Sequence, residues 1–299
     1  MQSLLLFDSC FGAASLLARL PTVPSTWKGV RLVADFSVNP LGVLPPAEHE
    51  GGDGVPVTAI PPSSLDRIFR VLQSWDGIAA EVAAAEGDET SLLTVLGCNT
   101  ASVGHAALSD SQRGRLPHLR RSMVSLVRDS LAAIPAQPGQ RLGVMATQFT
   151  VASGRYQEML ARWDGAAPAT TVGGLAATRT EAVVASLRHG TADGRSTILD
   201  ESGSFCANHD AVILGCTCFP LALDVLQPAA PTTRFIDPAE AWYREVNELA
   251  ATHGSVDQVP LHVTIRAGSA AHAPSVEQVE AQWTQLFGPR MSMGSCVRV

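Results

Sequence analysis

Two of the six cysteines, Cys98 and Cys216, occupy matching settings and are the residues best suited to chemistry. Cys98 lies in LTVLGCNTAS and Cys216 in AVILGCTCFP, so each follows a short apolar run and Leu-Gly. Each pattern predicts a strand that ends near the cysteine and leads into a helix. The free N–H groups and positive partial charge of a helix N-terminus lower the pKa of a thiol from about 8.5. The sequence therefore predicts two thiols that can ionise at strand ends.

Two such thiols on opposite sides of a cleft could work as a pair of acid–base groups. One thiolate would remove a proton from a carbon between them, and the other thiol would return a proton to the opposite face. The product would be the mirror image of the substrate. Buried cysteines are also common as small apolar residues, so a purely structural role stays open on the repeat alone.

Polar residues accompany these two strand ends and two earlier ones. Asp8 ends the run LLLFD, and Thr147 ends LGVMAT, so each half has a polar strand end followed later by a cysteine. Ligands of parallel sheets bind at the carboxyl ends of the strands, and we expect these four ends to meet at one cleft. Asn99, Thr100 and Thr217, which follow the cysteines, carry groups that suit a carboxylate.

Metal and cofactor chemistry fit the sequence poorly. Cys206, His209, Cys216 and Cys218 resemble zinc ligands, but the expected strand 211–214 would separate His209 from Cys216 by roughly 23 Å at ~3.3 Å per residue. Lys28 is the only lysine and lies in a connector, which disfavours a pyridoxal phosphate enzyme. The chain has no G-x-S-x-G, G-x-G-x-x-G or Walker A motif. We expect neither a metal nor a cofactor.

The composition limits the partners of this chain. Its net charge of −7 over 299 residues argues against nucleic acid or an anionic membrane. No apolar run reaches the 18 residues of a membrane span, and the N-terminus lacks the basic residues of a secretion signal. Six cysteines are too few for a disulfide scaffold, so we expect reduced thiols and a cytoplasmic location.

Apolar, β-branched runs alternate with amphipathic segments, which predicts an α/β fold with parallel strands buried on both sides. The expected strands are Leu4–Phe7, Val30–Ala34, Leu92–Leu96, Leu142–Ala146, Thr170–Val172, Ala211–Leu214 and His262–Ile265. The expected helices are Leu65–Trp75, Ser122–Ile134, Val151–Trp163, Glu181–Arg188, Leu221–Leu226, Ala239–His253 and Val276–Phe287. Five prolines and three glycines predict a surface loop over Val43–Pro62.

The segments LLLFDSCFG, NPLG, LGCNTAS, GVMATQFTVASGRYQEML, VILGCTCFPL and FIDPAEA resemble, in this order, the cofactor-independent glutamate racemases of the Asp/Glu racemase superfamily. The match runs from Leu4 to about Leu249 and covers most of the chain. It implies two pseudo-symmetric, doubly wound parallel-sheet domains, 1–121 plus 237–299 and 122–236, with the active site in the cleft between them.

The resemblance also implies roles for individual residues. Cys98 and Cys216 would be the catalytic thiols, with Asp8 as a further catalytic residue beside the first thiol. The residues at substrate-binding positions of the family are Ser9, Pro40, Leu41, Gly42, Asn99, Thr100, Thr147, Thr150, Thr217 and Cys218. Helix capping is the competing explanation for Thr147 and Thr150.

Several positions depart from the pattern of the family. Cys10 and Ala13 stand where it has glycines, and Leu41 replaces a tyrosine that encloses the substrate. Cys218 replaces a histidine that assists the second thiol, and a cysteine is not a base of comparable pKa. These changes leave the scaffold intact and indicate an altered substrate preference.

The resulting hypothesis is that the protein racemises an amino acid, with glutamate as the first candidate substrate. The only partner we expect is this small amino acid or carboxylate, and a homodimer is left open. For glutamate, the family implies supply of D-glutamate for peptidoglycan in cell wall biogenesis. One alternative is an isomerase or racemase acting on aspartate, a maleate-like compound or a hydantoin. Another is a non-catalytic, racemase-like binding protein.

Overall fold

The computed structural model describes residues 2–9, 12–18, 23–24, 27–38, 41–42, 44, 60–87, 92–119, 121–122, 140–161, 170–175, 202–239, 255–256, 261–266, 275–277 and 293–298. Cys10, Pro40 and most of the predicted loop Val43–Pro62 lie outside these residues. The same holds for residues 123–134 and for the helices predicted over Glu181–Arg188, Ala239–His253 and Val276–Phe287, apart from the first residue or two of the last two.

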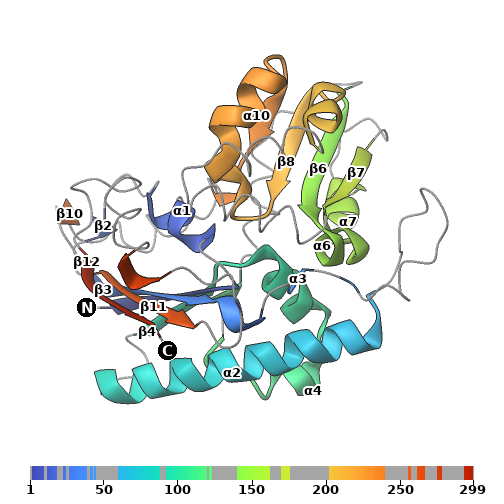
Figure 1. The fold of residues 1–299 in the computed structure, drawn as a ribbon. Coiled ribbons are helices and arrows are strands. Elements are labelled where there is room, and N and C mark those ends of the chain that lie inside the picture. Colours follow the sequence, from blue (N-terminus) through green and yellow to red (C-terminus); the bar gives the residue numbers. More distant parts are fainter. Residues whose placement is uncertain are drawn as a thin grey trace.

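The larger sheet is parallel throughout and joins strands from both ends of the chain (Figure 1). Its order is β12-β11-β3-β1-β4-β5. The strands are β1 (Gln2–Asp8), β3 (Trp27–Asp35), β4 (Leu92–Leu96), β5 (Arg121–Ser122), β11 (Leu261–Arg266) and β12 (Met293–Arg298). The apolar run Leu4–Phe7 forms the centre of this sheet because β1 pairs with both β3 and β4.

The second sheet has the order β7-β6-β8-β9 and is also parallel. Its strands are β6 (Leu142–Thr147), β7 (Thr170–Leu175), β8 (Ala211–Gly215) and β9 (Arg234–Ile236). Every residue of β6 and β8 is buried, as expected of continuous apolar runs in a sheet covered on both faces. A short antiparallel pair, β2 (Val23–Pro24) with β10 (Ser255–Val256), lies apart from both sheets.

Helices connect these strands and cover the sheets. They are α1 (Gly12–Ala18), η1 (Phe36–Val38), α2 (Pro62–Glu86), α3 (Asn99–Ala107), α4 (Asp110–Arg113), α6 (Gln148–Ala152), α7 (Arg155–Ala161), η4 (Phe219–Ala222) and α10 (Leu223–Ala229). In Figure 1, α2 runs beneath the larger sheet, and α3 lies between that sheet and the smaller one above it.

The long helix α2 is set by its sequence at both ends and along one face. Pro62 occupies the first turn, where its missing N–H costs nothing, and Gly87 ends the helix with a φ of 74°. The apolar residues Ile68, Leu72 and Trp75 lie on one face and are fully buried. Trp75 stacks on Phe7 of β1 with ring centroids 5.3 Å apart, which fixes α2 against the sheet.

The expected α/β fold and its strands are confirmed, and four helix predictions need correction. The helix expected over Leu65–Trp75 extends to Pro62–Glu86. The helix expected over Val151–Trp163 is instead two short helices, because Gly154 adopts a φ of 67° and ends the first. Ser122, the expected start of another helix, belongs to β5. The segment predicted as helix Leu221–Leu226 begins as the 3-10 turn η4.

None of the helices within the described ranges has the length and apolar character needed to cross a membrane.

Candidate active site

The carboxyl ends of β1, β4, β6 and β8 carry the polar residues predicted for the site. Asp8 and Thr147 are the last residues of β1 and β6. Cys98 is the N-cap of α3 two residues after β4, and Cys216 directly follows β8. All four side chains are buried, with exposed fractions of 1%, 6%, 5% and 8% for Asp8, Thr147, Cys98 and Cys216.

The dipeptide Asp8–Ser9 contacts both cysteine motifs. The Ser9 hydroxyl lies 3.4 Å from the sulfur of Cys98. The Thr217 hydroxyl, next to Cys216, donates to Oδ2 of Asp8 over 3.0 Å. The same carboxylate oxygen accepts a hydrogen bond from the backbone N–H of Ala13. Adjacent residues at the end of β1 therefore connect the strand ends of the two sheets, with Ser9 beside Cys98 and Asp8 beside the segment of Cys216.

This close approach depends on a glycine at the start of α1. A Cβ added to Gly12 would collide with the Thr217 hydroxyl and would lie 2.9 Å from the sulfur of Cys218. The segment after Cys216 can pack against α1 only because residue 12 has no side chain.

Three threonines, from α3, the end of β6 and α6, form one hydrogen-bonded cluster. The hydroxyls of Thr100 and Thr147 lie 2.9 Å apart, and the Thr147 hydroxyl donates to Thr150 over 3.0 Å. Thr147 also caps α6, since its hydroxyl accepts from the backbone N–H of Thr150. The capping explanation for Thr147 is therefore correct, and the same hydroxyl also contacts Thr100 across the two sheets.

Tyr156 on α7 joins the site, although sequence reasoning did not single it out. Its side chain is 1% exposed, and its hydroxyl donates to Oδ1 of Asn99 over 3.1 Å. Burial raises the pKa of Tyr156, and negative charge at Cys216 and Asp237 raises it further. The available signal was the rarity of tyrosine, which occurs twice in the chain, together with its place in the segment GVMATQFTVASGRYQEML.

Leu41 and Gly42 lie against the same group of residues. The backbone N–H of Phe149 donates to the carbonyl of Gly42 over 3.0 Å, and a Cβ on Gly42 would lie 2.5 Å from the Cβ of Thr147. Leu41 is 1% exposed and shares an apolar cluster with Cys98 and Phe149. The buried side chain of Leu41 is therefore apolar at the position where the family pattern has a tyrosine.

The surroundings of the two thiols differ. Cys98 belongs to the apolar cluster between α2, α3 and one face of the larger sheet. Cys216 belongs to a second cluster that includes Cys218 and residues of α1. Cys218 is fully buried and gives the second thiol an apolar neighbour at the position where it replaces the histidine of the family pattern.

Cys206 and His209, two of the four residues that resemble zinc ligands in the sequence, make other contacts in the structure. The sulfur of Cys206 lies 3.9 Å from that of Met145, and burial raises the pKa of its thiol to about 11. The ring of His209 lies against Phe205, with centroids 4.4 Å apart. Among the residues that the structure describes, no group of three His, Cys, Asp or Glu side chains could hold a metal ion.

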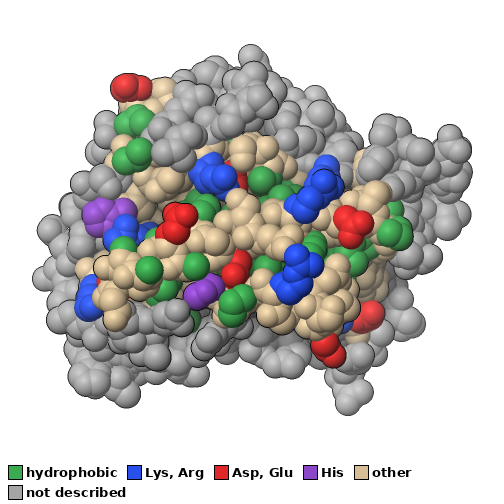
Figure 2. Space-filling view, turned by 90° about the horizontal axis from the view of Figure 1, so that it is seen from below, with side chains coloured by type: hydrophobic (Ala, Val, Ile, Leu, Met, Phe, Trp, Pro, Cys, Tyr) green, Lys and Arg blue, Asp and Glu red, His purple; other side chains and the backbone are tan. Residues whose placement is uncertain are grey.

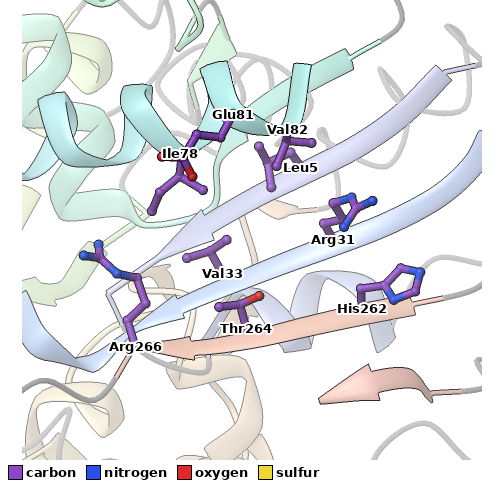
Figure 3. Close-up of a pocket in the computed structure, with 9 residues that line it drawn as sticks. All are labelled: Leu5, Arg31, Val33, Ile78, Glu81, Val82, His262, Thr264 and Arg266. Atoms are coloured by element: carbon purple, nitrogen blue, oxygen red, sulfur yellow. The ribbon is translucent and has the colours of Figure 1, made fainter. Parts of the chain in front are cut away.

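A cavity of about 290 Å³ lies on another side of the molecule, between α2 and strands β1, β3 and β11 (Figure 3). Two arginines at its rim are already paired: Arg31 lies 3.5 Å from Glu86, and Arg266 lies 2.7 Å from Asp35. Figure 2, which views the α2 side, shows basic and acidic side chains interspersed among the described residues. None of the residues that line this cavity is a predicted site residue, so we place the candidate active site at the strand ends.

Two parallel sheets with polar strand ends and paired Cys motifs make this a two-sheet α/β protein with the arrangement that the racemase resemblance implied. Residues 47–246 match the Asp/Glu/Hydantoin racemase family model, and the chain belongs to this family.

Curated relatives agree with this assignment. The chain is 28% identical over 194 residues to a glutamate racemase from Latilactobacillus sakei, covering 63% of this chain and 66% of the relative. It is 27% identical over 202 residues to a glutamate racemase from Shouchella clausii, covering 65% and 68%. The chain thus spans about two thirds of the length of these two relatives.

Solved structures share the fold over nearly their full length. A glutamate racemase from Campylobacter jejuni superposes with a TM-score of 0.62 at 19% identity, over 95% of this chain and 97% of that one. A glutamate racemase isoform from Bacillus anthracis gives 0.63 at 17% identity, over 100% and 97%. The predicted two-sheet racemase fold is confirmed.

Proposed function

We propose that this protein racemises an amino acid without a cofactor, glutamate being the first candidate, and that Cys98 and Cys216 are the opposed thiolate and thiol. The observation that carries this proposal is the contact of Asp8–Ser9 with both cysteine motifs. It brings the segments of the two thiols to one buried place, where a small substrate could lie between them.

In this mechanism one sulfur, as thiolate, takes the proton from Cα, and the other, as thiol, gives a proton to the opposite face. Negative charge develops next to the substrate carboxylate during the transfer. Asn99, Thr100, Thr147, Thr150 and Thr217 are buried side-chain donors near the two cysteines, and they would hold the carboxylate and ammonium groups.

The relatives named as glutamate racemases support glutamate as the first substrate to test. Leu41 and Cys218 support an altered pocket, because both positions are apolar and buried. Aspartate, a maleate-like acid and a hydantoin therefore remain alternative substrates. A chain that turns over none of them would be the non-catalytic binding protein.

The cellular setting follows from the same proposal. Turnover of glutamate would supply D-glutamate for peptidoglycan in the cytoplasm. The proposal also includes a first domain of residues 1–121 plus 237–299 and a second domain of residues 122–236. The division of the strands between the two sheets supports these domains, except that Ser122 of β5 belongs to the larger sheet. The oligomeric state, with a homodimer as one possibility, is left to measurement.

The test is a circular dichroism screen of D- and L-glutamate, D- and L-aspartate and hydantoins, with maleate followed by its ultraviolet absorbance. Cys98→Ser and Cys216→Ser should each abolish turnover, because each removes one of the two proton-transfer groups. Cys296→Ser is the matched control, since Cys296 lies in β12, away from the strand ends of the site. Full activity in both site variants would refute the thiol mechanism, and no turnover by the wild type would refute the enzymatic proposal.

A further inference from the structure

Tyr156 touches the segments of both proposed thiols. Its hydroxyl donates to Oδ1 of Asn99, the residue after Cys98, over 3.1 Å. Its ring carbon Cζ lies 3.2 Å from the position that a Cβ on Gly215 would take, and Gly215 precedes Cys216. The side chain is 1% exposed, so solvent does not compete for its hydroxyl.

The hydrogen bond determines which way the Asn99 amide points. An asparagine side chain has an acceptor oxygen and a donor NH2 group that exchange places when the amide flips. Because the Tyr156 hydroxyl occupies Oδ1, the NH2 group of Asn99 is directed to the other side. An amide held in this way presents donors, which a carboxylate can accept.

Two features of the structure surround Tyr156 in this position. The guanidinium of Arg155 donates to the carbonyl of Ala106 over 3.3 Å, which ties α7 to α3 beside the hydrogen bond to Asn99. A Cβ on Gly215 would lie 2.8 Å from the Cβ of Ala146 as well as against the tyrosine ring. The absence of a side chain at the glycine before Cys216 therefore leaves the ring the space from which its hydroxyl reaches Asn99.

We propose that Tyr156 is a positioning residue that orients the Asn99 amide so that its NH2 group donates to the carboxylate of the substrate. This inference rests on the proposed function for the identity of the ligand. In this proposal Tyr156 acts through Asn99, to which its hydroxyl donates, and not on the reacting carbon. Burial raises the pKa of Tyr156, which keeps the hydroxyl protonated and able to donate.

The kinetic test replaces Tyr156 by phenylalanine, which keeps the ring and removes only the hydroxyl. An interaction made equally in the ground and transition states changes KM and leaves kcat unchanged. Tyr156→Phe should therefore raise KM for the carboxylate substrate roughly threefold to tenfold, the value of a single hydrogen bond, with kcat within about twofold. Thr233→Val is the matched control: Thr233 is also buried, but its hydroxyl bonds to carbonyls of Cys206 and His209. It should leave both constants unchanged.

A double-mutant cycle separates positioning from general loosening of the structure. In an Asn99→Ala background the amide is absent, so Tyr156→Phe should cause no further rise in KM. An equal rise in both backgrounds overturns the inference, because Tyr156 would then act without Asn99. A fall in kcat with unchanged KM overturns it as well.

A spectroscopic measurement tests the same contact without turnover. The chain has four asparagines, so selective 15N labelling gives few side-chain amide signals, and Asn99→Ala assigns one of them. Tyr156→Phe should shift the Asn99 signal, and Thr233→Val should not. An unshifted signal overturns the inference even if the enzyme is active. A shifted signal in a protein that racemises none of the substrates would refute the proposed function and retain the orientation of Asn99 by Tyr156.

Discussion

The hydrogen bond between Thr217 and Asp8 should be one of the strongest single links between the two sheets. It is 3.0 Å long, and its partners are only 5% and 1% exposed, so water hardly screens it. Hydrogen bonds to a charged group contribute about 1.5–3 kcal/mol to stability. Thr217→Val removes the donor and leaves Asp8 with one hydrogen-bond partner fewer. We expect it to lower the free energy of unfolding by about 1.5–3 kcal/mol, a large share of the 5–15 kcal/mol typical of a protein.

The assay is urea unfolding followed by tryptophan fluorescence, with Thr217→Val, Asp8→Asn and the double variant compared in one cycle. The coupling energy between the two sites should be about 1.5 kcal/mol or more, because both single variants break the same charged hydrogen bond. Thr233→Val, which removes a buried hydroxyl bonded to uncharged carbonyls, should show no coupling with Asp8→Asn. Additive effects of Thr217→Val and Asp8→Asn, with coupling below about 0.5 kcal/mol, would refute the reasoning.

Three further predictions concern the scaffold. Gly12→Ala should lower the free energy of unfolding by about 1–3 kcal/mol, because the added Cβ would collide with Thr217. Gly77→Ala should raise it by about 0.5–1 kcal/mol, because an added Cβ there has no atom within 4 Å. Thermal melting tests both predictions. Asp35→Asn should cost roughly 2–3 kcal/mol in urea unfolding, since the buried carboxylate accepts from Trp75 and from a partly exposed Arg266; an unchanged midpoint would contradict this. Burial raises the pKa of the Cys206 thiol from 9.0 to about 11, so the stability from its protonated form is complete below pH 9.0 and is lost as the pH rises through 11. Cys206→Ser should therefore lose less unfolding free energy than the wild type over this interval, and an equal loss would speak against the raised pKa.

The strands and the order of the site residues could be predicted from the sequence because each depends on a local pattern. The apolar runs before Asp8, Cys98, Thr147 and Cys216 leave few alternatives to buried parallel strands. The parallel pairing of β1 with β4 and of β6 with β8 then places all four polar ends at carboxyl edges. Family resemblance added the expectation of two sheets.

The rest depended on contacts between residues far apart in the chain. The bond between Asp8 and Thr217 spans 209 positions, and the bond between Tyr156 and Asn99 spans 57, so no local pattern announces either one. The single helix expected over Val151–Trp163 was wrong because an apolar periodicity continues through Gly154, where the backbone turns to a positive φ. A glycine inside a periodic segment was the local sign of that break.

The central claim is that two different thiols serve the two faces of one carbon, and the fate of the Cα proton tests it most directly. One enantiomer of the accepted amino acid is incubated in deuterated water and sampled early in the reaction. The account predicts that the newly formed enantiomer carries deuterium at Cα while the remaining starting enantiomer keeps its hydrogen. Product that retains the original hydrogen, or starting material that exchanges as fast as product forms, would indicate a single base and contradict the pairing of Cys98 with Cys216.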